Sequence, residues 1–145
     1  MESDEAVNKL IYELQVLRNV GEDLQQRIGF VNAAISELKM AASTLEGLGE
    51  VAEDMLVPIG GGSYVRAKLV DRERLIVGIG SDTAVEKTVA EAREDFNVRV
   101  LELEKARSSL QGQFDEASAR VDVVQRELRK LTQVGQTTGE ASDNV

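Results

Sequence analysis

The chain has 145 residues, with 26 acidic and 17 basic side chains and a net charge of −9. This length suits a single domain, and the absence of Cys and His excludes disulfides, thiolate nucleophiles, His-based catalysis and the usual zinc sites. We therefore expect no catalytic residue, metal or cofactor, and the acidic balance argues against nucleic-acid binding. Without an apolar run of membrane-spanning length or a leader-like start, we expect a cytoplasmic protein that binds no membrane.

Apolar residues recur with heptad spacing through residues 3–46. Of the twelve positions in this repeat, only Gly21 lacks an apolar side chain. The repeat consists of Val7, Leu10, Leu14, Leu17, Gly21, Leu24, Ile28, Val31, Ile35, Leu38, Ala42 and Leu45. Such spacing predicts a long helix with a coiled-coil seam. Ser3 is expected to cap its start, and Gly47 and Gly49 to end it.

A matching repeat predicts a second long helix over residues 88–134. It consists of Val89, Ala92, Phe96, Val100, Leu103, Arg107, Leu110, Phe114, Ala117, Val121, Val124, Leu128 and Leu131. Two successive steps of four, on either side of Phe96, indicate a stutter in the coiled coil. Thr88 with Glu91 fits a capping box, although Thr83 with Glu86 fits one too, which would start the helix five residues earlier. Residues 135–145 are small and polar, so we expect a flexible tail there.

Two helices of similar length, joined by about forty residues, are expected to pair antiparallel. Charge supports this pairing, because residues 1–20 carry a net charge of −2 and residues 120–134 a net charge of +2. Length matching places Val7 near Glu127, so that Leu128, Leu131 and Val134 would extend past the first helix.

Several apolar residues at the free end of the pair lie off the seam. These are Ile11, Tyr12, Val16, Val20, Val123 and Val134. Composition alone leaves two interpretations open. They are either ordinary flanking positions of the coiled coil with a frayed end, or an exposed apolar tip for a protein partner.

The segment between the helices, residues 55–87, is expected to form β-structure. Short strands are expected over residues 56–59, 64–69, 75–79 and 84–87. Turns are expected at Gly60–Gly62, at Asp71–Arg74 and at Gly80–Asp82, where glycine and short polar residues accumulate. Pro58 cannot donate a ladder hydrogen bond, so its strand should lie at an edge.

This β segment is too small to be stable by itself. Four short strands would leave two open edges and one apolar face, and helices that extend away would not cover that face. We therefore predict obligate oligomerisation through the strands, which a well-folded monomer would contradict.

Glycine-rich runs and carboxylate clusters are the chemical candidates in this sequence. Gly60–Ser63 lacks the Lys of a phosphate-binding loop, and Gly78–Gly80 has Thr83 where a third glycine would be needed. Both runs are interpreted as hairpin turns. The clustered carboxylates are interpreted as the solvated outer face of the coiled coil. They are Glu91, Glu94, Asp95, Glu102 and Glu104.

The central block carries a family resemblance. Leu-Val-Pro-Ile-Gly-Gly-Gly-Ser-Tyr-Val-Arg-Ala-Lys-Leu at 56–69, Val-Gly-Ile-Gly at 77–80 and Ala-Val-Glu-Lys-Thr at 84–88, set between two coiled-coil segments, resemble prefoldin α subunits, archaeal ones above all. The resemblance spans about Val7 to Val134. Two hairpin units favour the α class, because the β class has one.

The resemblance implies one prefoldin-like domain over residues 1–145, mainly α with a small β unit. Its fold would be a long antiparallel two-helix coiled coil, with helices joined by two β-hairpins that assemble into an oligomeric β-barrel platform. Two such α subunits would join four prefoldin β subunits in a hexamer. The platform residues would be Val57, Ile59, Val65, Leu69, Ile76, Val77 and Ile79.

The function implied by the resemblance is that of an ATP-independent chaperone. Such a subunit captures unfolded proteins at its coiled-coil tips, here about residues 5–16 and 121–134, and delivers them to a group II chaperonin. The expected client contacts are Val7, Leu10, Ile11, Leu14, Val124, Leu128, Leu131 and Val134.

Three other functions are weighed against this one. A structural coiled-coil tether or scaffold would share the heptads but would not need the strands. A transcript-cleavage or ribosome-associated coiled-coil factor would usually join its helices by a tight functional loop. An enzyme is the weakest alternative, because His and Cys are missing.

Overall fold

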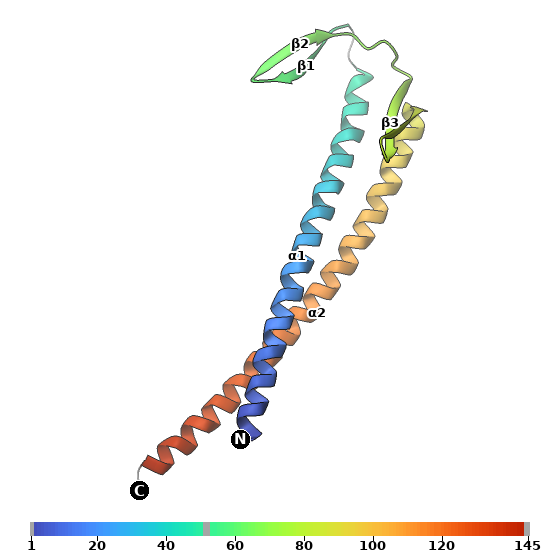
Figure 1. Ribbon diagram of the computed structural model, residues 1–145. Coiled ribbons are helices and arrows are strands. Elements are labelled where there is room, and N and C mark those ends of the chain that lie inside the picture. Colours follow the sequence, from blue (N-terminus) through green and yellow to red (C-terminus); the bar gives the residue numbers. More distant parts are fainter. Residues whose placement is uncertain (1, 51–52, 144–145) are drawn as a thin grey trace. The chain divides into compact units, whose positions relative to one another are not determined.

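The computed structural model describes the backbone of residues 2–50 and 53–143, and their side chains as far as residue 133. Its elements, in chain order, are α1 (Glu2–Leu48), β1 (Met55–Gly60), β2 (Ser63–Ala67), β3 (Arg74–Gly80), β4 (Thr83–Thr88) and α2 (Val89–Asp143) (Figure 1). The expected fold class is confirmed, with two long helices and two small antiparallel hairpins between them. The closed barrel expected of an assembly is not a property of one chain.

The structure decides between the two possible starts of α2 and shows that the helix is longer than expected. The amide N–H of Glu91 donates a hydrogen bond to Thr88 Oγ1 at 3.2 Å, so Thr88 is the N-cap, and the earlier start at Thr83 is excluded because β4 occupies that segment. The expected helix end at residue 134 is wrong, since α2 continues to Asp143. Gly135 and Gly139 each cost a helix about 1 kcal/mol relative to Ala but still adopt helical dihedrals. Residues 144 and 145 lie outside the described part.

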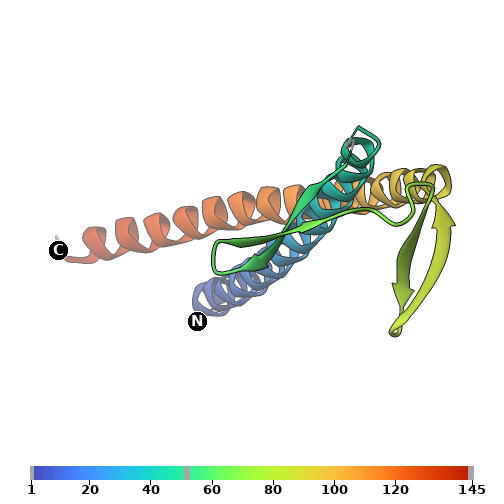
Figure 2. The ribbon, with the colours of Figure 1, turned by 90° about the horizontal axis from the view of Figure 1, so that it is seen from above.

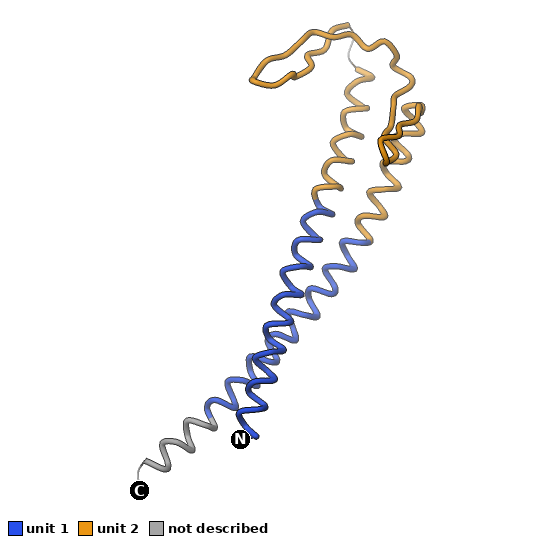
Figure 3. Tube along the Cα trace, viewed as in Figure 1, with its two compact units in different colours: residues 1–32, 106–145 blue, residues 33–105 orange. Residues whose placement is uncertain are grey.

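The chain forms two compact units (Figure 3). Unit 1 comprises residues 1–32 and 106–145, and in its described part the two helices run side by side. Unit 2 comprises residues 33–105 and contains the remaining parts of both helices together with the two hairpins.

The coiled-coil seams are confirmed in both units. All twelve seam positions of α1 and all thirteen of α2 are buried or half-buried. The stutter is accommodated, because Ala92, Phe96 and Val100 all face inward. Arg107, the one charged seam residue, donates a hydrogen bond from Nη1 to Asn32 Oδ1 at 3.1 Å and so remains partnered.

The strands form two separate two-stranded sheets, not one sheet of four (Figure 2). In the β1–β2 hairpin Val57 pairs with Val65, and in the β3–β4 hairpin Val77 pairs with Val85. Every strand is an edge strand, which satisfies the expectation for Pro58.

The two hairpins repeat one design at a spacing of twenty residues. Val57, Ile59, Gly60 and Val65 recur as Val77, Ile79, Gly80 and Val85. Each hairpin has a register shift around its Ile, and each closes through a two-residue turn, Gly61–Gly62 or Ser81–Asp82, with positive φ at both residues. This is the type I′ geometry that tight hairpins favour. The expected glycine turn is confirmed at Gly61–Gly62, but the run Gly78–Gly80 lies within β3 and the second turn is formed by Ser81–Asp82.

The β3–β4 hairpin packs on the helices of its own unit. Val77, only 5% exposed, forms a core with Ala92 and Phe96. Half-buried apolar residues surround this core, namely Leu38, Ala41, Ala42, Leu45 and Leu75. The expectation that the helices leave the strands uncovered is therefore wrong for this hairpin, because the chain turns directly from β4 into α2 and lays β3 against both helices.

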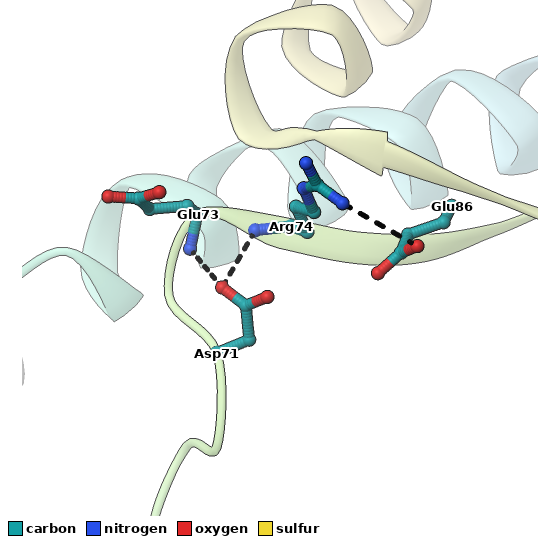
Figure 4. A network of polar contacts seen from close by, with 4 residues as sticks. All are labelled: Asp71, Glu73, Arg74 and Glu86. Carbon is teal, nitrogen blue, oxygen red and sulfur yellow. Dashed lines mark hydrogen bonds and ion pairs between the residues drawn. The ribbon is translucent and has the colours of Figure 1, made fainter.

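Polar contacts fix the same hairpin to α2. Lys87 Nζ forms an ion pair with Asp95 Oδ2, and the amide N–H of Val89 donates to the Glu73 carbonyl oxygen at 2.9 Å. The expected polar turn before β3 is built on Asp71, whose Oδ1 accepts hydrogen bonds from the amides of Glu73 and Arg74 at 2.8 and 3.2 Å (Figure 4). These contacts hold the β3–β4 hairpin in place against α2.

Candidate functional site

An ion pair sets the register of the helix pair in unit 1. Arg120 Nε lies 2.6 Å from Glu13 Oε1, which joins the acidic end of α1 to the basic segment of α2 as the charge pattern predicts. The hydrogen bond from Arg120, reinforced by its charge, holds the pKa of Glu13 below its ordinary value of 4.5. Both side chains are partly exposed, Arg120 at 47% and Glu13 at 36%, so this pair specifies alignment more than it adds stability.

Beyond this ion pair, toward the N-terminus of α1, the helices line an open apolar groove of about 460 Å³. Its walls are formed by Ala6, Lys9 and Leu10 of α1 and by Glu127, Lys130 and Leu131 of α2. We call these six residues the tip groove. Because Leu131 lies in the same groove as Ala6 and Leu10, it does not extend past α1 as length matching had suggested.

The structure places the expected client-contact residues in three environments. Val7, Leu10, Leu14, Leu128 and Leu131 are half-buried, whereas Ile11 is 44% exposed. Val124 is fully buried in the helix pair, so a client could contact its side chain only if the helices separated. The side chain of Val134 lies outside the described residues.

The off-seam apolar residues near the tip are solvent-exposed, with Tyr12 the most exposed at 69%. The others are Ile11, Val16, Val20 and Val123. These side chains add exposed apolar surface to unit 1, where Phe30, farther along α1, is also exposed at 75%.

Heptad analysis misses four of the six residues of the tip groove. Ala6, Lys9, Glu127 and Lys130 lie outside the apolar seam, and a search for apolar client contacts passes over lysines. Their aliphatic stems nevertheless contribute apolar surface while the ammonium groups remain in water. The sequence signal that could have identified the lysines is their position directly before the seam leucines Leu10 and Leu131.

Six of the seven expected platform residues lie in the two hairpins, but Leu69 does not, because β2 ends at Ala67 and the strand expected over residues 64–69 is shorter than predicted. Those with exposed side chains are Val57, Ile59, Val65, Ile76 and Ile79. Leu69 is half-buried. Val77 differs from the others because it is buried within its own unit, while its neighbour Ile76 is 78% exposed on the opposite face of β3.

The clustered carboxylates on α2 form no metal site. Asp95 is paired with Lys87, and Glu104 Oε1 lies 3.8 Å from Lys39 Nζ. Among the described residues, no group of three acidic side chains is arranged to hold a metal ion. No helix in this described part is both long and apolar enough to cross a membrane.

Comparison with known proteins identifies the family. The family model for prefoldin subunits matches residues 17–134, which is most of the chain. The chain belongs to the prefoldin family. Prefoldin subunits are chaperones, so the expectation that the chain is not an enzyme is confirmed.

The relatives that resemble this prefoldin chain are archaeal. It is 33% identical to prefoldin subunit alpha of Pyrococcus horikoshii over 135 residues, which covers 91% of each chain. It is 39% identical to prefoldin subunit alpha of Methanopyrus kandleri over 112 residues, or 76% of this chain and 71% of that one. The sequence resemblance to archaeal α subunits is thereby confirmed.

A solved structure supports the fold. The chain superposes on the filamentous PFD of Methanocaldococcus jannaschii with a TM-score of 0.69 and 24% sequence identity. The match covers 80% of this chain and 98% of the other. The prefoldin arrangement of helices and hairpins is therefore the fold of this chain.

Proposed function

We propose that this chain is the α subunit of a cytoplasmic, ATP-independent chaperone that captures unfolded proteins at its coiled-coil tip and delivers them to a group II chaperonin. The observation that carries this proposal is the tip groove, an open apolar site at the free end of a prefoldin helix pair. Of the two glycine-rich segments, one forms the turn at Gly61–Gly62 and the other lies in β3, which agrees with a mechanism that uses no nucleotide.

The groove suits weak capture of many sequences. Leu10 and Leu131 present half-buried side chains to it, so an incoming apolar side chain would gain part of the roughly 1.5–3 kcal/mol available from complete burial. One such contact would bind an unfolded chain only weakly. Several tips carried on one platform would raise the apparent affinity through effective concentration.

The platform is proposed to consist of two copies of this chain and four β subunits. Exposed apolar side chains on both hairpins, such as Ile59 and Ile76, support this part of the proposal. So do the four edge strands, because unpaired strand edges are ready to accept strands from other chains.

The test is suppression of client aggregation by the purified assembly. A variant with Leu10→Ser and Leu131→Ser removes the apolar walls of the groove, and we expect it to hold clients several-fold less well while its oligomeric state is unchanged. Retention of full holding activity by an assembled double variant would contradict the proposal.

A matched control separates lost client contact from a weakened coiled coil. Ile28 and Leu110 are also half-buried seam residues of unit 1, but they lie outside the tip groove. Ile28→Ser with Leu110→Ser should reduce helix-pair stability comparably and leave client holding nearly intact. Equal losses in both variants would mean that pair stability, not the groove, determines holding.

A further inference from the structure

The tip groove has a basic rim on both of its walls. Lys9 of α1 and Lys130 of α2 line it beside the leucines, and both side chains are exposed. Glu127 is the only acidic residue among the six that line the groove. The lining of the groove therefore carries two basic side chains against one acidic side chain.

Structural roles do not account for these two lysines. Among the side chains that the structure describes, neither forms an ion pair, whereas Arg120 nearby pairs with Glu13. The helix dipole does not explain Lys130, because that effect is confined to the last turn and α2 continues to Asp143. Both ammonium groups are therefore available to a bound molecule.

We propose that the tip groove selects apolar client segments that carry Asp or Glu next to the apolar residue. This inference rests on the proposed function and specifies the client class. An apolar side chain would lie against Leu10 and Leu131, and the lysine stems would extend the apolar wall. A neighbouring client carboxylate would then meet Lys9 or Lys130.

Charges close to the groove decide this preference, and beside the two lysines they include Glu127 in the groove and Glu5 and Glu13, one helical turn to either side of Lys9. At physiological ionic strength the Debye length is about 8 Å, so the many distant acidic groups are largely screened from a client held in the groove. An exposed ion pair adds only a few tenths of a kcal/mol up to about 1 kcal/mol. Two lysines therefore bias the choice of client without preventing its release.

The experiment measures the binding of three fluorescent peptides to the full-length chain in its native assembly, by anisotropy at 0.15 M salt. The peptides share one Leu-Phe-Leu core and differ only in flanking residues, which are Asp, Asn or Lys. We expect the Asp-flanked peptide to bind most tightly. Lys9→Gln with Lys130→Gln should weaken it by about fivefold, the size expected for two exposed pairs, and should leave the Asn-flanked peptide unchanged.

The matched control removes the same charge elsewhere. Lys68 and Lys105 are exposed and lie outside the groove, so Lys68→Gln with Lys105→Gln should change none of the three affinities. An equal loss in this control, or an equal loss for the Asp- and Asn-flanked peptides in the tip variant, would overturn the inference. Equal binding of all three peptides by the unmodified chain would overturn it too, but would leave the proposed function standing. Binding of none of them would overturn both.

Discussion

Gly21 is the single position of the α1 seam without a side chain, and its effect is local. A cleft of about 230 Å³ opens beside it, with Leu17, Phe114 and Val121 among the lining residues. A Cβ atom built on Gly21 would lie 3.8 Å from Phe114 Cε2, which is ordinary van der Waals contact. The seam thus tolerates a larger residue here, and the glycine locally weakens the helix pair of unit 1.

We predict that Gly21→Ala stabilises the chain by about 1 kcal/mol through helix propensity, with a further gain from the methyl group packed on Phe114. Gly29→Ala is the matched control, because a Cβ there has no neighbour within 4 Å and gains propensity alone. Urea unfolding followed by circular dichroism at one fixed chain concentration measures both. Equal stabilisation by the two substitutions would show that the Gly21 cleft contributes nothing.

At the scale of elements, the two faces of β3 have different tasks. Val77 faces inward against Ala92 and Phe96, while Ile76 projects outward from the next position of the same strand. Side chains alternate between the faces of a strand. Val77 therefore contributes to the stability of the chain itself, while Ile76 is exposed to other chains.

We predict that Val77→Ala lowers the free energy of unfolding by about 2 kcal/mol, because it leaves a cavity under the β3–β4 hairpin. Ile76→Ala should change that free energy by less than about 0.5 kcal/mol but weaken oligomer formation. Urea unfolding and light scattering after size-exclusion chromatography measure the two effects. Dissociation of the oligomer by Val77→Ala at denaturant-free equilibrium, with Ile76→Ala unaffected, would contradict this division of roles.

Much of this element structure can be predicted from the sequence. Heptad spacing places every seam residue of both helices correctly, and turn residues locate both hairpins. The burial of Val77 cannot be predicted from the sequence, because strand alternation shows which residues share a face but not what covers that face. The C-terminal end of α2 cannot be predicted either, because Gly135 and Gly139 indicate a helix end but lie within the helix.

At the scale of the whole molecule, the proposed client-binding surface combines seam and off-seam residues from opposite ends of the sequence. Leu10 and Leu131 follow from the apolar repeat, whereas Lys9 and Lys130 emerge only when the antiparallel register is known. The Glu13–Arg120 pair supplies that register. A one-dimensional pattern therefore predicts the apolar part of the groove and misses its charged rim.

The exposed apolar strands support the proposal that this chain functions only as part of a prefoldin hexamer. Native mass spectrometry of the tagged chain, recovered from its own cells, tests this most directly. We predict a complex of two copies of this chain with four copies of a smaller chain. Recovery of a homodimer without any partner would contradict the hexameric platform and favour a coiled-coil tether.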